Sequence, residues 1–250
     1  MANTCTAADA GVICRESNLN RRNILQLLGA SFFYPYLSHG QNMNLVEMSL
    51  PTPKAMRSGW AALAAVLASR GWKKVIYATS NQWQYHDGGG NWVILRKIDR
   101  DKILMFGYDH EYTETYFREA AEYFQSEETD LLSGAPEWWS QDLWTAEFEN
   151  WVGFIYGWDG LKWKRAVYDK EDGFNSTGLI RSCCDDPINT IKIYAADAPG
   201  LKGKQPNGSA IKDLIAADGK LTHELLNSVV PGWDIEAGVL AGKKFLDMEL

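Results

Sequence analysis

Residues 71–139, GWKKVIYATSNQWQYHDGGGNWVILRKIDRDKILMFGYDHEYTETYFREAAEYFQSEETDLLSGAPEWW, decide the fold. The first half of this stretch contains four short runs rich in Val, Ile, Tyr, Trp and Phe, a composition typical of β-strands. We expect strands at residues 73–78, 82–86, 92–98 and 102–108. The turns between them, such as Asp87-Gly88-Gly89-Gly90, are too short for parallel crossovers, so these runs predict an antiparallel meander.

Apolar residues at helical spacing predict a helix on each side of the meander. The first spans residues 59–70, with Ser58 as its N-cap and Gly71 as its stop. Its apolar stripe consists of Trp60, Leu63, Val66 and Leu67. The second spans residues 115–124. Its expected buried face comprises Tyr116, Phe117, Ala120, Ala121 and Phe124.

The rest of the chain mixes strands with helices. Pro136 begins a short helical or irregular segment, and Ser209 is the expected cap of a helix at 209–217. Further strands or extended pieces are expected at 149–158, 161–168, 174–179 and 188–194, and further helices at 221–229 and 235–246. This order predicts an α+β fold, an antiparallel β-sheet meander packed by helices, with a helical C-terminal appendage. Residues 43–184 would form the core domain, and 185–250 a helical extension of the same domain.

The N-terminal residues 1–42 are expected to lie outside the folded domain as an export signal or an unstructured leader. Arg21-Arg22 followed by the apolar run 27–37 resembles a twin-arginine export signal, and the run is too short to span a bilayer as a stable helix. Gln26 and the absence of an Ala-x-Ala site depart from that pattern. The alternative is translation from Met43 or Met48. The protein is periplasmic on the first interpretation and cytoplasmic on the second.

Charge and cysteine content exclude several function classes. The net charge is −7 and no stripe of Lys or Arg offsets it, which argues against binding to nucleic acid. The four cysteines form no Cys-x-x-Cys pair and have no His at ligand spacing. We therefore expect no metal, no cofactor and no disulfide framework. The eleven Trp and eleven Tyr provide ample material for a core and for interfaces.

One cluster contains the raw material for acid–base chemistry. Asp109, His110 and Glu111 follow an expected strand, and His86 ends another, so the four side chains could meet at one end of the sheet. Carboxylates beside imidazoles serve general acid–base catalysis or bind a divalent metal, which would make the protein a hydrolase that acts with or without a metal. The alternative is a hydrogen-bonded turn in which Asp109 caps the next helix.

Tryptophans beside acidic residues provide the material for a partner-binding surface. Aromatic side chains dominate binding energy in interfaces, and carboxylates suit a basic protein partner. The expected partner-binding residues are Asp109, Glu111, Trp138, Trp139, Asp142, Trp158 and Asp159.

Several stretches resemble small bacterial proteins that are associated with the immunity proteins of toxin systems. They are Asp-Gly-Gly-Gly-Asn-Trp at 87–92, Gly-Tyr-Asp-His-Glu-Tyr-Thr-Glu-Thr-Tyr-Phe at 107–117, Glu-Thr-Asp-Leu-Leu at 128–132, Ala-Pro-Glu-Trp-Trp at 135–139 and Gly-Phe-Ile-Tyr-Gly-Trp-Asp-Gly at 153–160. The resemblance covers about the middle half of the chain. It implies a non-enzymatic immunity protein that neutralises a bacterial toxin by direct contact, and it brings no catalytic residues.

Overall fold

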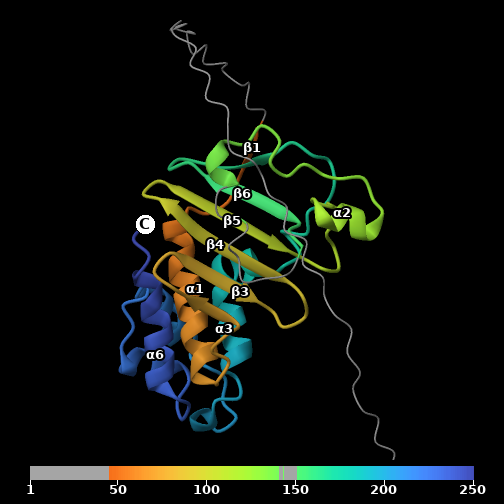
Figure 1. The fold of residues 1–250 in the computed structure, drawn as a ribbon. Helices are drawn as coiled ribbons and strands as arrows, with labels where there is room; N and C mark the ends of the chain where they lie inside the picture. The colour runs from red at the N-terminus through yellow and green to blue at the C-terminus, as the bar shows by residue number, and fades with distance from the viewer. Residues whose placement is uncertain (1–44, 141–142, 144–150) are drawn as a thin grey trace, which may run out of the picture. The chain divides into compact units, whose positions relative to one another are not determined.

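The computed structural model describes residues 45–140, 143 and 151–250, and these contain one seven-stranded antiparallel sheet (Figure 1). The spatial order of the strands is β1-β7-β6-β5-β4-β3-β2. Their bounds are β1 Leu45–Met48, β2 Ile76–Ala78, β3 Gln82–His86, β4 Trp92–Asp99, β5 Lys102–Tyr108, β6 Phe154–Trp158 and β7 Trp163–Ala166. The helical layer contains α1, α3 and the helices of the C-terminal segment, so the α+β fold class is confirmed.

The predicted meander is present as β2 to β5, each strand pairing antiparallel with the next. β3 and β5 have the predicted bounds, whereas β2 is shorter because residues 73–75 form a turn. Sequence reasoning missed β1, which pairs with β7 at the edge of the sheet opposite β2. The predicted leader at residues 1–42 lies outside the described residues.

The helices have the following bounds. They are α1 Pro53–Ser69, α2 Glu119–Phe124, α3 Pro187–Ala195, α4 Gly208–Ala216, α5 His223–Val229 and α6 Ile235–Lys243. Short helical turns occur at η1 Glu137–Trp139, η3 Arg181–Asp185, η4 Pro199–Leu201 and η5 Lys244–Leu246. None of the helices in the described part of the chain is both long and apolar enough to cross a membrane.

Two predicted helix caps were wrong. α1 begins at Pro53, since the hydroxyl of Thr52 accepts the Ala55 N–H at 3.2 Å, and the predicted cap Ser58 lies inside the helix. The predicted stop at Gly71 fits, since this residue follows the helix with a φ of 97°. α4 is capped by Asn207, whose side-chain oxygen accepts the Ser209 N–H at 2.9 Å.

The strand predicted at 188–194 was wrong, because this segment is helix α3. Asp186 caps it by accepting the Asn189 N–H at 3.3 Å, and Pro187 occupies the first turn. Its buried residues Ile191 and Ala195 lie four positions apart, which is helical spacing. The extended piece predicted at 174–179 is instead a series of turns leading into η3.

The sheet separates two apolar cores. Successive residues of β4 point to opposite faces: Val93 and Leu95 enter the core shared with the helices, and Trp92 and Ile94 enter a smaller core. The smaller core is covered by the segment that follows β5, through Phe117, Leu131, Trp139 and Leu143. Both faces of the central strands are therefore buried, which explains why β4 is apolar at four successive positions from Trp92 to Leu95.

α1 is the central element of the helical layer, beside α3 and α6 in Figure 1. Every residue from Gly59 to Ser69 is buried, as expected for a helix enclosed on all sides. α6 approaches it closely at Gly238, where an added Cβ would lie 2.0 Å from the Ser69 Oγ and 2.6 Å from the Ala65 carbonyl oxygen. The absent side chain at Gly238 is what allows the two helices to pack at this distance.

Candidate binding surface

Three aromatic side chains in mutual contact form an exposed patch on and beside α2. Tyr123 is 71% exposed and Phe124 is 41% exposed. Their ring centroids lie 4.7 and 4.6 Å from that of the half-buried Trp151, and 5.1 Å from each other. A contiguous exposed group of large aromatic rings marks an interaction site more often than scattered apolar residues do. We name Tyr123, Phe124 and Trp151, together with Glu119 and Glu122, the aromatic–acidic surface.

The local sequence explains why these rings face solvent. α2 begins at Glu119, four residues later than predicted, and buries only Ala120 and Ala121. It ends after Phe124 because Gln125 adopts the left-handed conformation, with a φ of 52°. Tyr123 and Phe124 therefore occupy the last turn of a short helix that stands out to one side of the sheet (Figure 1).

The predicted buried face of this helix was consequently wrong in part. Phe117, Ala120 and Ala121 are buried, but Tyr116 is half-buried and Phe124 is exposed. Tyr116 precedes the helix, where its carbonyl oxygen accepts the Thr129 N–H at 2.8 Å. Its ring packs against Phe124 at 5.3 Å and so supports the patch from beneath.

The patch carries surplus negative charge. Glu119 and Glu122 are exposed in the first turn of α2, where carboxylates favour the helix dipole. Three further exposed carboxylates follow the helix at Glu127, Glu128 and Asp130. Within the described residues, none of these five groups forms an ion pair with a Lys, Arg or His side chain. Exposed rings bordered by unpaired carboxylates match a partner that presents Lys or Arg, since cations bind both groups.

Asp109 and Trp139 were predicted at a partner-binding surface, but both are buried, with exposures of 0% and 1%. The Trp139 indole lies over Gly157 of β6, where an added Cβ would come within 2.3 Å of the ring. Because this position has no side chain, the indole packs flat on the sheet and belongs to the smaller core. These two residues cannot contact a partner in this conformation.

The other predicted partner-binding residues are dispersed. Trp138 and Trp158 are half-buried, with ring centroids 5.9 Å from Trp139 and 5.6 Å from Trp163. Glu111 and Asp159 are exposed, and Asp159 pairs with Lys164 at 2.8 Å. Asp142 lies outside the described residues. Sequence reasoning missed Tyr123, Phe124 and Trp151; the signal that could have found them is the pair of adjacent aromatics beside four glutamates at 119–128.

Asp109 forms the hydrogen-bonded turn given above as the alternative to catalysis, but it does not cap the next helix, because α2 begins only at Glu119 and has no side-chain cap. Its Oδ1 accepts the N–H groups of Glu111 and Tyr112, each at 2.9 Å, and its Oδ2 has no hydrogen-bond partner among the described residues. The His110 imidazole contacts the Asn91 side chain, with 3.1 Å between the His110 Nδ1 and the Asn91 Oδ1. The imidazole of His86 has no hydrogen bond or ion pair to these residues.

Metal and thiol chemistry find no support in this geometry. Within residues 45–140, 143 and 151–250, no group of three or more His, Cys, Asp or Glu side chains is placed to hold a metal ion. Burial raises the pKa of the Cys183 thiol well above its ordinary value. Burial and the charge of Asp185 raise the pKa of Cys184 to about 12. Both thiols therefore stay protonated and are poor nucleophiles.

Comparisons of the whole chain with protein-family models, with curated proteins and with solved structures found no match. The interpretation of the surface therefore depends on its own chemistry.

Proposed function

We propose that the protein is a non-enzymatic binding protein that contacts a basic protein partner through the aromatic–acidic surface. We propose that this partner is a bacterial toxin, because the resemblance to immunity proteins implies that the protein neutralises one. If residues 1–42 contain a twin-arginine signal, this contact takes place in the periplasm. The observation that carries the proposal is the cluster of three touching rings, 41% and 71% exposed at Phe124 and Tyr123, beside unpaired carboxylates.

The energetics of interfaces support this choice of surface. Aromatic anchors at the centre of an interface supply most of the binding energy, while charges at the rim raise the association rate and select the partner. The rings are already packed on one another, and Trp151 is braced by Tyr108 of β5 at 6.2 Å. Binding therefore requires little ordering of these side chains, which reduces its entropic cost.

The hydrolase alternative gains no comparable observation. Asp109 is engaged in a turn, His110 contacts Asn91, and Glu111 lies 4.0 Å from the His110 Nε2 at an exposed position. General acid–base work needs these groups arranged around one substrate position. His86 lies at the expected end of the sheet, since it pairs with Trp92 and Trp92 pairs with Tyr108, but among the described residues it forms no hydrogen bond or ion pair with Asp109, His110 or Glu111.

The test is affinity capture from the native bacterium with paired baits, followed by binding measurements on the purified partner. Tagged wild-type protein should capture a basic partner in stoichiometric amount. The double variant Tyr123→Ser/Phe124→Ser should weaken binding of that partner by at least about a hundredfold, because two hot-spot residues are worth roughly 2 kcal/mol each or more. Isothermal titration calorimetry measures the loss, and an activity assay of the captured protein shows whether binding inhibits it.

A matched control removes exposed apolar area from the helical layer. Ile193 of α3 is 64% exposed and Leu240 of α6 is 54% exposed, so Ile193→Ser/Leu240→Ser should leave affinity unchanged. Glu119→Lys/Glu122→Lys should slow association and remove its salt dependence. Equal binding by the aromatic variant and the control variant would contradict the proposal.

A further inference from the structure

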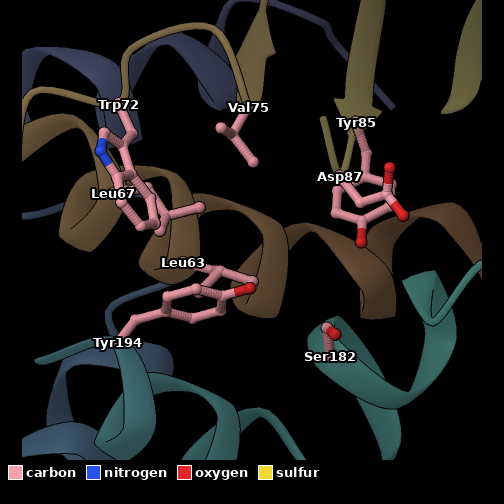
Figure 2. A pocket seen from close by; sticks show the side chains of 8 residues that line it. All are labelled: Leu63, Leu67, Trp72, Val75, Tyr85, Asp87, Ser182 and Tyr194. Atoms are coloured by element: carbon pink, nitrogen blue, oxygen red, sulfur yellow. The ribbon is translucent and has the colours of Figure 1, made fainter. Parts of the chain in front are cut away.

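A cavity of about 300 Å³ opens in the helical layer, on the side of the sheet opposite the smaller core (Figure 2). Its walls come from α1, the α1–β2 loop, β3, η3 and α3. The lining residues are Leu63, Leu67, Trp72, Val75, Tyr85, Asp87, Ser182 and Tyr194. The volume is at the lower end of the range for small-molecule sites. The cavity is separate from the aromatic–acidic surface, since no residue that lines the cavity belongs to α2 or to that surface.

One wall of the cavity is apolar. Leu63 and Leu67 lie one helical turn apart on α1, and Val75 faces them from the segment before β2 (Figure 2). Trp72 closes this wall and meets the Tyr194 ring edge-on, with 6.1 Å between centroids. Such a wall suits a compact hydrocarbon or aromatic body.

Three side chains that line the cavity carry hydroxyl groups with no hydrogen-bond partner among the described residues. Tyr85 reaches into the cavity from β3, Tyr194 from α3 and Ser182 from η3 (Figure 2). Within the described part of the chain, none of these three hydroxyls forms a hydrogen bond. Burial, assisted by the charge of Asp87, raises the pKa of Tyr85, so its hydroxyl stays protonated at neutral pH. Convergent hydroxyls without partners are available to a ligand.

Asp87, an exposed residue of the β3–β4 turn, brings a carboxylate to the edge of the cavity. Its Oδ1 accepts the Gly89 N–H at 2.6 Å and its Oδ2 accepts the Asn91 Nδ2–H at 2.8 Å, so the turn holds the group in place. No cationic side chain among the described residues pairs with it. On the Trp72 side of the cavity, Arg70 lies over the Trp72 ring at 4.4 Å and forms an ion pair with Asp197 at 2.7 Å.

We propose that this cavity binds a small primary amine, with its ammonium group on Asp87 and its apolar body against the α1 wall. An ammonium group donates three hydrogen bonds, and the Asp87 carboxylate and the Tyr85 hydroxyl oxygen, which lie side by side in the cavity wall (Figure 2), are acceptors for it. The aromatic faces favour the same positive charge. A neutral alcohol of equal size fills the apolar wall but forms no charge-assisted hydrogen bond, and an organic anion is repelled by Asp87.

The test compares three probes that share a phenylethyl group, on the full-length protein, by isothermal titration calorimetry at neutral pH. The probes are 2-phenylethylamine, 2-phenylethanol and 3-phenylpropionate. The amine should bind at least about tenfold more tightly than the alcohol, which corresponds to one charge-assisted contact, and the anion should bind most weakly. Equal affinities for amine and alcohol, or no heat from the amine at millimolar concentration, would overturn the proposal.

Substitutions of residues that line the cavity test whether the amine binds there. Asp87→Asn preserves an acceptor for the turn but removes the charge, so it should weaken the amine about tenfold and leave the alcohol unchanged. Tyr85→Phe keeps the charge and should weaken the amine several-fold, and Leu67→Trp should abolish binding of both by filling the space. The control Asp99→Asn removes an exposed carboxylate at the far end of β4. Thermal unfolding confirms that each variant is folded, and amine binding that persists in Asp87→Asn contradicts the proposal.

Discussion

At the scale of single residues, the buried carboxylate of Asp172 ties the sheet to the segment that follows β7. Its Oδ2 accepts the hydroxyls of Tyr156 at 2.6 Å and Tyr168 at 2.8 Å, and its Oδ1 accepts the Phe174 N–H at 3.1 Å. Each hydrogen bond to a charged group is worth about 1.5 to 3 kcal/mol. The three bonds therefore fix a turn that carries no regular secondary structure.

The same pair of tyrosines predicts an alkaline limit of stability. Burial, followed by the charge of Asp172, raises the pKa of Tyr156 and of Tyr168 above the ordinary value of 10.0. The unfolded chain loses these protons from about pH 10, while the folded chain keeps them. The contribution of these two tyrosines to the free energy of unfolding is therefore constant below about pH 10 and falls above it. The expected slope is up to about 1.4 kcal/mol per pH unit for each tyrosine.

Urea unfolding at about pH 8, 10 and 11 measures this slope. Tyr156→Phe should cost about 1.5 to 3 kcal/mol at pH 8 through the lost hydrogen bond to the Asp172 carboxylate, and it should make the alkaline slope shallower. Tyr123→Phe changes an exposed tyrosine and serves as the control, with an unchanged slope. A slope that stays the same in Tyr156→Phe would show that other groups set the alkaline limit.

At the scale of elements, α1 and α6 pack at a distance that only glycine permits at position 238. Gly238→Ala places a methyl group 2.0 Å from the Ser69 Oγ and 2.6 Å from the Ala65 carbonyl oxygen, so the helices must separate. Overpacking of this kind costs about 1 to 3 kcal/mol. The expected result is a loss of that size in the free energy of unfolding, measured by urea denaturation.

Gly208→Ala is the matched control for this substitution. Its added Cβ would lie 3.5 Å from the Lys192 Cε, which is an ordinary contact, and alanine favours the first turn of α4. We expect a change within about 0.5 kcal/mol, or a small gain. Equal losses in the two variants would show that the close approach of α1 and α6 does not limit stability.

Elements whose apolar pattern fits only one type of secondary structure could be predicted from the sequence. Elements whose pattern fits both a strand and a helix could not. β3 and β5 have their predicted bounds because short turns enclose alternating runs. The run 188–194 is apolar at intervals that suit a strand or a buried helix, and its cap at Asp186 decides for the helix. The aromatic–acidic surface was missed because the direction of Phe124 depends on where α2 begins. The positive φ of 52° at Arg118 prevents the helix from starting before Glu119.

At the scale of the whole molecule, the sheet and the C-terminal helices share one core. α1 contacts α3, α4 and α6 on the side away from the sheet, and buried residues of these helices belong to the same cluster as Val93 and Met105. Residues 43–184 taken alone would leave α1 open to water along the side that these helices cover. Burial of apolar area is the main source of folding free energy, and that side contributes much of it.

We therefore expect a chain cut after residue 184 to lack cooperative folding. Heating should give no sharp transition by circular dichroism, and amide exchange in β4 should be fast. The control is residues 43–250, which keep every described element and should unfold in one transition. A cooperative transition in residues 43–184 would show that the sheet and α1 suffice as a folding unit.

The position of α1 between the sheet and α6 also has a consequence for biosynthesis. α1 is among the first elements to leave the ribosome, and α6, which covers it, is the last helix to do so. At 5 to 20 residues per second, roughly ten to thirty seconds pass between the two. For that period a helix with no hydrophilic face from Gly59 to Ser69 lacks its final cover. The nascent chain must therefore be shielded by a chaperone or held in a loose collapsed state until translation ends.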